Sequence, residues 1–247
     1  MRGLRALALC LVCSAGAGQA APPAPPVEVE GCAGVLVRIA DPSELAAGEG
    51  VAAHLCRARE ALEARLPGVL PRVRVRAWVA RDMQEFRART GRAAYIAAAV
   101  HADEIITQPG RGLARVEDLG QVLAHELCHL VLRRLAGPGL PRWLEEGLAQ
   151  HLPGAPAPAA ALPAGEDALL ALEQRLGAPD APDEAGRQAR AEDYRAALAC
   201  VERLSSQVGL ERLVRGLPGL VGPDWLGREL AGRPLRAWLF PPPARTN

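Results

Sequence analysis

The chain has 247 residues, which is long enough for one substantial domain or one domain with an appendage. Hydrophobic residues make up 49% of it and charged residues 23%, a balance that excludes both an intrinsically disordered chain and a membrane-embedded one. The formal net charge of +1 argues against a strongly basic surface, so we expect no nucleic-acid partner.

The first 20 residues have the pattern of a secretory signal. Arg2 and Arg5 precede a short apolar run, 7–12, which passes into small residues up to Ala20. The run is shorter than the roughly 20 apolar residues that span a bilayer. We therefore expect cleavage near Ala17 or Ala20, export to the periplasm or the cell exterior, and no stable membrane span afterwards.

The segment that follows the signal, 21–26, is rich in proline and is predicted to be a linker. A lipoprotein acylated at Cys10 or Cys13 is the less favoured alternative to an ordinary signal, because Leu9 and Val12 are poor residues just before such a cleavage.

Four cysteines remain after removal of the signal: Cys32, Cys56, Cys128 and Cys200. An even number in an exported chain allows two disulfides. We favour a Cys32–Cys56 bridge, because both residues lie in the N-terminal segment. For Cys128 and Cys200, a second bridge and two small buried thiols on helices are equal alternatives.

Strand and helix patterns alternate up to residue 108. Alternation of apolar and polar residues indicates strands, whereas apolar residues at intervals of three and four indicate helices. The expected elements are a strand at 35–39, a helix at 49–66, a strand at 73–79, a helix at 82–91 opened by an Asp82–Glu85 capping box, and strands at 93–100 and 104–108.

The rest of the chain is predicted to be mainly helical. Proline and glycine punctuate it and delimit its helices and loops. The expected helices are 117–136, 142–152, 188–207, 209–216, 224–231 and 234–239, with loops at 153–164 and 177–186. Strands early and helices late predict an α+β fold, with an N-terminal mixed sheet and a helical C-terminal part in a single domain, 27–247.

One motif in the long helix has the spacing of a zinc site: His125-Glu126-Leu127-Cys128-His129. His125 and His129 are four residues apart, so both imidazoles project from one face, one turn apart. Two imidazoles at that separation suit Zn²⁺, whose bonds to histidine nitrogen are about 2.0–2.1 Å long. Glu126 is the expected general base. The alternative is a pair of surface histidines on an amphipathic helix.

A catalytic zinc site needs three protein ligands and one open position. Candidates for the third ligand are Glu145, Glu146 and His151 on the following helix, which the short turn 137–141 allows to fold back. Consecutive helical residues diverge by about 100°, so Glu145 and Glu146 cannot both point at the metal. Spacing alone leaves the choice open.

The segment after the motif resembles the gluzincin metallopeptidases, in particular the bacterial peptidase-MA-like family. In that family the zinc motif is followed by a Pro-x-Trp-x-x-Glu-Gly-x-Ala element. The matching positions here are Pro141, Trp143, Glu146, Gly147 and Ala149. The resemblance covers 117–152 well and about 50–240 loosely. It implies a thermolysin-like (zincin) fold and Glu146 as third zinc ligand, with Glu145 facing outward unless it supports a ligand.

The resemblance also bears on other residues of the chain. Tyr194, at the start of a later helix, could stabilise the oxyanion as a tyrosine does in related gluzincins, although packing is the favoured role. His151 is expected to be structural, and His54 and His101 to face solvent. By analogy with thermolysin-like folds, the strand Glu104–Gln108 is expected to be an edge strand that pairs with an extended substrate.

We therefore expect an exported zinc metallopeptidase that holds one Zn²⁺ per chain and acts on a peptide or protein substrate. Glu126 would take a proton from the attacking water and pass it to the leaving amine. The alternatives are a non-catalytic, zinc-containing exported binding module and a zinc hydrolase of cell-wall amides. The sequence indicates neither the cleavage specificity nor the oligomeric state.

Overall fold

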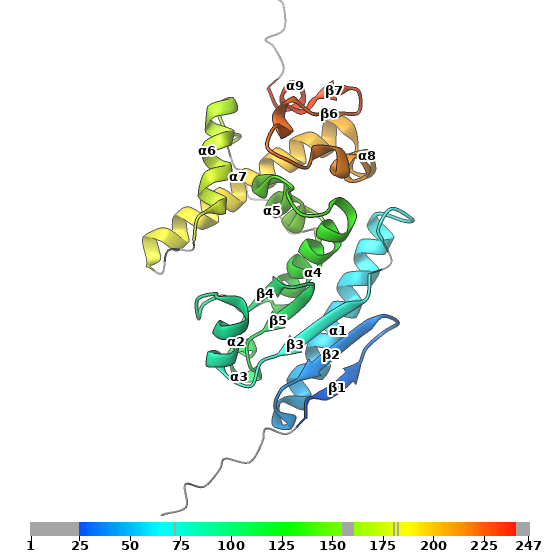
Figure 1. Cartoon of the computed structure of the whole chain (residues 1–247), viewed down its shortest axis with the longest axis vertical. Helices are drawn as coiled ribbons and strands as arrows, with labels where there is room; N and C mark the ends of the chain where they lie inside the picture. The colour runs from blue at the N-terminus through cyan, green and yellow to red at the C-terminus, as the bar shows by residue number, and fades with distance from the viewer. Residues whose placement is uncertain (1–24, 72, 155–160, 180, 182, 241–247) are drawn as a thin grey trace, which may run out of the picture.

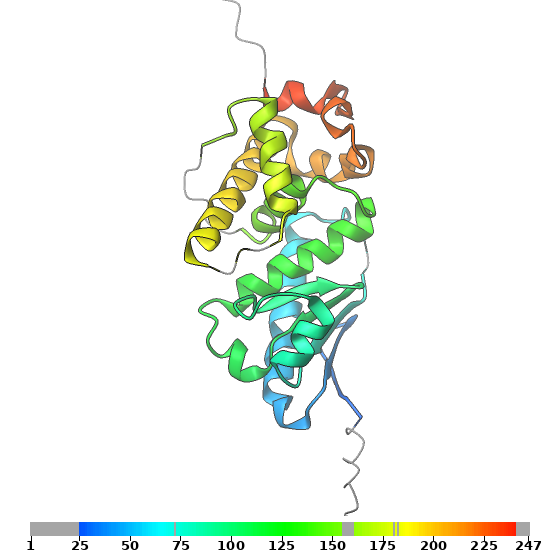
Figure 2. The ribbon, with the colours of Figure 1, turned by 60° about the vertical axis from the view of Figure 1, so that its left-hand side comes forward.

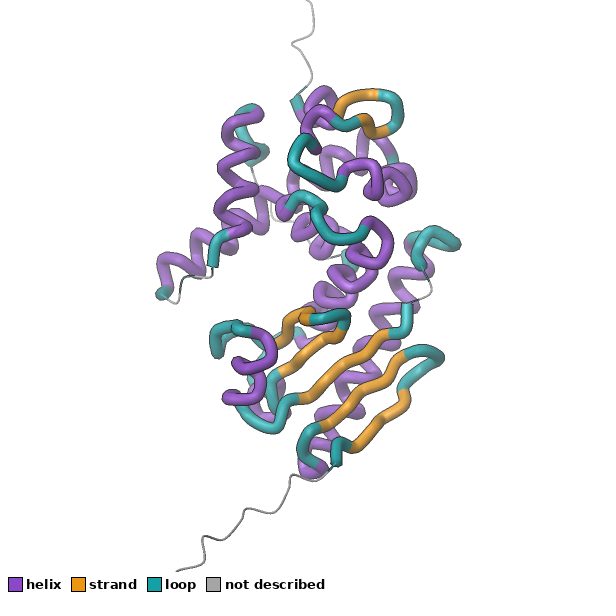
Figure 3. Tube along the Cα trace, viewed as in Figure 1, coloured by secondary structure: helices purple, strands orange, loops and turns teal. Residues whose placement is uncertain are grey.

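A five-stranded mixed sheet forms the N-terminal half of the protein (Figures 1 and 3). The computed structural model describes residues 25–71, 73–154, 161–179, 181 and 183–240. The strands are β1 (Val27–Glu30), β2 (Val35–Ile39), β3 (Val75–Val79), β4 (Ala98–His101) and β5 (Glu104–Thr107), in the order β1-β2-β3-β5-β4. β2, β3 and β5 are parallel neighbours, and β1 and β4 pair with them antiparallel at the two edges.

Alternation along the central strands determines which face of the sheet is buried. In β3, Val75, Ala77 and Val79 are buried and Arg76 between them is exposed. Two helices, α1 (Leu45–Arg65) and α4 (Leu119–Ala136), pack on the sheet and on each other. The helix α1 connects the parallel strands β2 and β3, as a crossover between parallel strands requires.

Three shorter helices complete this half. They are η1 (Pro42–Glu44), α2 (Met83–Thr90) and α3 (Gly110–Leu113). The predicted capping box of α2 is confirmed in one half: the Asp82 side chain accepts a hydrogen bond from the backbone N–H of Glu85. The Glu85 carboxylate accepts from the backbone N–H of Arg81, not from that of Asp82. The helix ends at Gly91, whose φ of 67° is the left-handed conformation that glycine adopts at no steric cost.

The C-terminal half is almost entirely helical and stands above the sheet in Figure 1. Its elements are α5 (Arg142–His151), α6 (Glu166–Gly177), α7 (Glu184–Val208), α8 (Leu210–Gly216), η2 (Leu217–Leu220), η3 (Trp225–Gly227), β6 (Glu229–Leu230), β7 (Arg233–Pro234) and α9 (Leu235–Leu239). The helix α4 lies between the two halves in both views (Figures 1 and 2). One contiguous hydrophobic core includes residues of both halves, such as Val37, Leu127, Trp143 and Val201. The expected α+β class is therefore confirmed.

Some expectations about elements were wrong. The segment 224–231 is not a helix but the short turn η3 followed by the β6–β7 hairpin, whose turn holds Ala231 and Gly232 at positive φ. The predicted loop 177–186 already contains the first residues of α7. The strand β1 and the helix α6 were not predicted.

The cysteines divide into one bridge and two thiols. Cys32 and Cys56 form a disulfide, as predicted. Cys128 and Cys200 are buried free thiols, so the second bridge is wrong and its alternative holds. Burial raises the pKa of both thiols, that of Cys200 to about 12.

The predicted secretory signal, 1–20, lies outside the described residues, as do Cys10, Cys13 and most of the predicted linker. Within the described part of the chain, no helix combines the length and the apolar character needed to cross a membrane.

Candidate metal centre

The helix α4 presents the two motif histidines on one face and packs its opposite face into the core. It begins after Asp118, whose side chain accepts a hydrogen bond from the backbone N–H of Gln121. Leu123, Leu127 and Leu130 are fully buried. His125 and His129 lie one turn apart, with the Nε2 atoms 3.1 Å from each other.

The helix α5 brings the third candidate ligand to this face. Its start is anchored by α6, because the Glu173 carboxylate accepts hydrogen bonds from the backbone N–H groups of Arg142 and Trp143. Further along, Gly147 lies against α7 so closely that a Cβ there would come within 2.5 Å of the Ala197 carbonyl oxygen. These two contacts hold Glu146, which is almost completely buried, over α4.

The three side-chain atoms form a small triangle. Glu146 Oε2 lies 3.4 Å from the Nε2 atom of His125 and 3.4 Å from that of His129. Bonds of about 2.0–2.1 Å to a tetrahedrally coordinated metal place ligand atoms about 3.3 Å apart. The buried Glu146 Oε2 atom also has no hydrogen-bond partner. His125, His129 and Glu146, called the metal group below, could therefore hold a metal ion, and their donor atoms fit one.

Glu145 contacts the other nitrogen of His129 and is as buried as Glu146. Its Oε1 atom lies 3.0 Å from Nδ1 of His129, so the carboxylate orients the imidazole whose other nitrogen faces the metal group. Arg133 and Arg142 also donate to this carboxylate. The expectation that Glu145 is an outward-facing neighbour is wrong, because Glu145 is buried against His129, one of the candidate ligands.

The carboxylates around His129 control its protonation. Burial lowers the pKa of His129, but its contacts with Glu145 and Glu146 outweigh burial and raise the pKa to about 10. Burial would raise the pKa of both glutamates, but the same contacts hold it below the usual range.

Glu126 is directed toward the edge of the sheet. Its Oε2 atom accepts a hydrogen bond of 3.0 Å from the backbone N–H of Val100 in β4. Burial raises the pKa of Glu126, against the opposing effect of the two histidines. The edge strand beside the site is thus β4; the expectation for 104–108 is wrong, because β5 lies between β3 and β4.

A small cavity of about 80 Å³ joins these groups, which is room for a few water molecules. It is lined by Arg92, Ile96, Ala98, Ala99, Val100, His125, Glu126, His129, Arg133, Arg142, Glu146 and Tyr194. The Tyr194 ring centroid lies 6.4 Å from that of His125. Tyr194 lies well inside α7, so the expectation that it stands at the start of a helix is wrong.

Comparison with protein-family models, with curated proteins and with solved structures finds no match to this chain.

The remaining histidines lie away from the metal group. His151 is half-buried at the end of α5, and burial lowers its pKa. His101 is exposed at the end of β4, as expected. His54 is half-buried, with its Nδ1 atom 3.0 Å from Arg57, so the expectation that it faces solvent holds only in part. Arg133 and Arg142 were not predicted, although each lies four residues along its helix from a candidate ligand, His129 or Glu146.

Proposed function

We propose that the protein is an exported zinc-dependent peptidase of the gluzincin type, with a zincin fold. The observation that carries the proposal is the triangle of His125, His129 and Glu146, with Glu126 lining the same cavity. The resemblance of 141–149 to the gluzincin element supports the same ligand set. The Cys32–Cys56 disulfide fits export, because disulfides persist in oxidising compartments.

A zinc ion held by these three side chains would supply a Lewis acid that polarises the carbonyl group and lowers the pKa of a water molecule. Glu145 fixes the imidazole of His129 through Nδ1, which leaves Nε2 facing His125 and Glu146, where it would bind the ion. Three protein ligands would leave one position for water, as hydrolytic zinc sites require, and the three candidate ligands line the cavity.

Glu126 is the proposed general base. It accepts a proton from the water as its oxygen bonds to the scissile carbonyl carbon, and it delivers that proton to the amine nitrogen as the carbon–nitrogen bond breaks. The products are a carboxylate and an amine. The backbone N–H of Val100 positions the Glu126 carboxylate for both transfers. Tyr194, which lines the same cavity, is the proposed hydrogen-bond donor to the carbonyl oxygen.

The experiment measures metal content and peptide cleavage in the wild type and in Glu126→Gln. The wild type should bind one zinc per chain and cleave members of a peptide library, identified by mass spectrometry. Glu126→Gln should keep the zinc and lose at least about 100-fold in rate. Glu211→Gln, an exposed charge change in α8, is the matched control and should leave both unchanged.

Two results would contradict the proposal. Cleavage by Glu126→Gln at the wild-type rate would show that Glu126 is not the general base. A zinc-loaded wild type that leaves the whole library intact would favour the binding module, or the amide hydrolase if it releases peptides from cell-wall material.

A further inference from the structure

Two arginines lie beside the metal group, each four residues along its helix from a ligand. Arg133 follows His129 in α4, and Arg142 precedes Glu146 in α5. Residues four apart share a helix face and are separated by about 6 Å along the axis. Both arginines line the cavity that contains the metal group.

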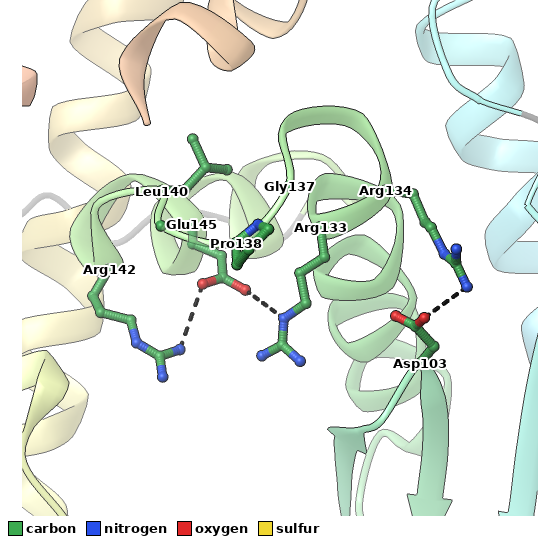
Figure 4. Close-up of a pocket in the computed structure, with 9 residues that line it drawn as sticks. Asp103, Arg133, Arg134, Gly137, Pro138, Leu140, Arg142 and Glu145 are labelled. Atoms are coloured by element: carbon green, nitrogen blue, oxygen red, sulfur yellow. Dashed lines mark hydrogen bonds and ion pairs between the residues drawn. The ribbon is translucent and has the colours of Figure 1, made fainter. Parts of the chain in front are cut away.

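The same two arginines also line a second, larger hollow of about 540 Å³ between the ends of α4 and α5 (Figure 4). Its other lining residues are Asp103, Arg134, Gly137, Pro138, Gly139, Leu140 and Glu145. Arg133 and Arg142 therefore lie at both spaces, the small cavity of the metal group and a hollow large enough for part of a substrate.

Each guanidinium uses only part of its hydrogen-bonding capacity. Arg133 Nε lies 3.3 Å from one oxygen of Glu145, and Arg142 Nη1 lies 3.4 Å from the other. A guanidinium has five N–H donors, so these single contacts leave most of them for another acceptor. The side chains are 36% and 41% exposed, and Figure 4 shows the terminal nitrogens of Arg133 directed away from Glu145.

Two guanidinium groups contact the same carboxylate, that of Glu145. Its single carboxylate is shared by two arginines and by the imidazole of His129. The neighbouring Arg134, in contrast, has its own partner, Asp103, at 2.7 Å. Arg133 and Arg142 thus share one carboxylate between two guanidinium groups, and a planar guanidinium pair suits a further carboxylate.

We propose that Arg133 and Arg142 bind a carboxylate of the substrate, one or two residues from the cleaved bond, and so determine which peptides are accepted. The rise of about 6 Å between the backbone positions of each arginine and its candidate ligand is close to the length of two residues of extended chain. The inference rests on the proposed peptidase function. The carboxylate is either the C-terminus of a peptide or an aspartate or glutamate side chain.

The test uses four dansylated peptides that differ only at the last residue. They are dansyl-Gly-Leu-Ala as free acid, dansyl-Gly-Leu-Ala amide, dansyl-Gly-Leu-Glu amide and dansyl-Gly-Leu-Gln amide. Affinities are measured by fluorescence anisotropy on zinc-loaded Glu126→Gln, and kcat/KM on the wild type. At least one carboxylate peptide should be favoured by about 10- to 100-fold over its neutral counterpart. The free acid identifies a terminal carboxylate, and the Glu amide a side chain.

Variants of the two arginines test whether they cause the preference for a carboxylate. Arg133→Gln and Arg142→Gln should each reduce the difference between charged and neutral peptides, mainly through KM. The control Arg215→Gln removes the same charge from an exposed position in α8 and should preserve the difference. Zinc content is measured in each, because both arginines also contact Glu145. If these variants lose zinc, the peptide pairs on the wild-type chain still decide the question.

Equal binding and equal cleavage of charged and neutral peptides would overturn the inference while leaving the peptidase function intact. Absence of any cleavage by the wild type would instead count against the peptidase function, and the binding measurements would still report whether the arginine pair prefers a carboxylate.

Discussion

At the scale of single residues, the metal group depends on a glutamate that is not a ligand. Glu145 connects α5 to α4 by accepting from Nδ1 of His129 and from Arg133. A carboxylate behind a ligating imidazole fixes its orientation and increases its basicity. The neighbouring residues Glu145 and Glu146 thus contact different nitrogens of the same imidazole: Glu145 contacts Nδ1 of His129 and Glu146 contacts Nε2.

Replacement of Glu145 by glutamine should weaken metal binding by about 10- to 100-fold, because the amide keeps the size of the side chain but loses the charge that polarises His129. The measurement is zinc affinity by competition with a chromophoric chelator. Glu211→Gln should have wild-type affinity. Unchanged affinity in Glu145→Gln would show that the contact at 3.0 Å contributes packing only.

Metal binding should release a proton from His129. Its pKa of about 10 lies above its ordinary value near 6.5, so the imidazole is charged at pH 7 and must lose a proton to become a ligand. The zinc affinity should therefore rise with pH between about 7 and 10. The stabilisation that the metal-free protein gains from the charged imidazole has the opposite trend: it is complete below about pH 6.5 and is lost as the pH rises through about 10.

Calorimetric titration with zinc in buffers of different ionisation enthalpy measures the number of protons released. About one proton should appear at pH 7, and fewer should appear above pH 10. A binding enthalpy that is independent of the buffer at pH 7 would contradict the raised pKa of His129.

The sequence predicts the metal group better than its surroundings. His125, Glu126 and His129 follow from spacing on one helix, because helix geometry alone determines their relative positions. The environment of Glu145 does not follow, because it depends on how α5 crosses α4. The resemblance to a known element predicted Glu146 as the third ligand, whereas spacing left the choice open.

At the scale of elements, α5 determines whether the ligands meet. It is buried over most of its length and packs between α4 and α7. Gly147, next to the third ligand, allows the backbones of α5 and α7 to approach closely. A side chain at this position would push α5 away from α7 and move Glu146 with it.

Gly147→Ala should lower the free energy of unfolding by about 1–3 kcal/mol, because the added Cβ lies only 2.5 Å from the Ala197 carbonyl oxygen and 2.7 Å from the Val201 side chain. It should also weaken zinc binding. Gly50→Ala is the matched control: it lies within α1 with no atom within 4 Å of the added Cβ, so it should stabilise by about 0.5–1 kcal/mol.

Urea unfolding measures both variants. Equal stabilisation by the two substitutions would mean that α5 and α7 do not pack closely around Gly147.

Elements with strong local signals were predicted well. The cap and the terminal glycine of α2 are confirmed because they depend only on neighbouring residues. The segment 224–231 was predicted incorrectly, because Trp225, Leu226 and Leu230 have helical spacing although the turn at Gly232 makes a hairpin. The order of the strands was also beyond local patterns: pairing of β3 with β5 places β4, not β5, at the edge.

At the scale of the whole molecule, the metal group lies where the sheet half and the helical half meet. Two of its residues belong to α4, which packs on α1 and the sheet, and the third belongs to α5, which packs on α7. A metal bound there would link the two halves through side chains. The disulfide, in contrast, acts within the N-terminal half alone, joining the turn after β1 to α1.

Removal of the disulfide should therefore leave metal binding unaffected. The double substitution Cys32→Ala/Cys56→Ala opens a loop with a sequence separation of 24, which should lower the free energy of unfolding by about 3 kcal/mol. Zinc affinity should be unchanged, because neither cysteine lines the cavity of the metal group. Urea unfolding and chelator competition measure the two quantities, and the reductant TCEP serves as the control: it should destabilise the wild type and leave the double variant unaffected. A loss of zinc affinity in the double variant would show instead that the geometry of the metal group depends on the position of α1 beneath α4.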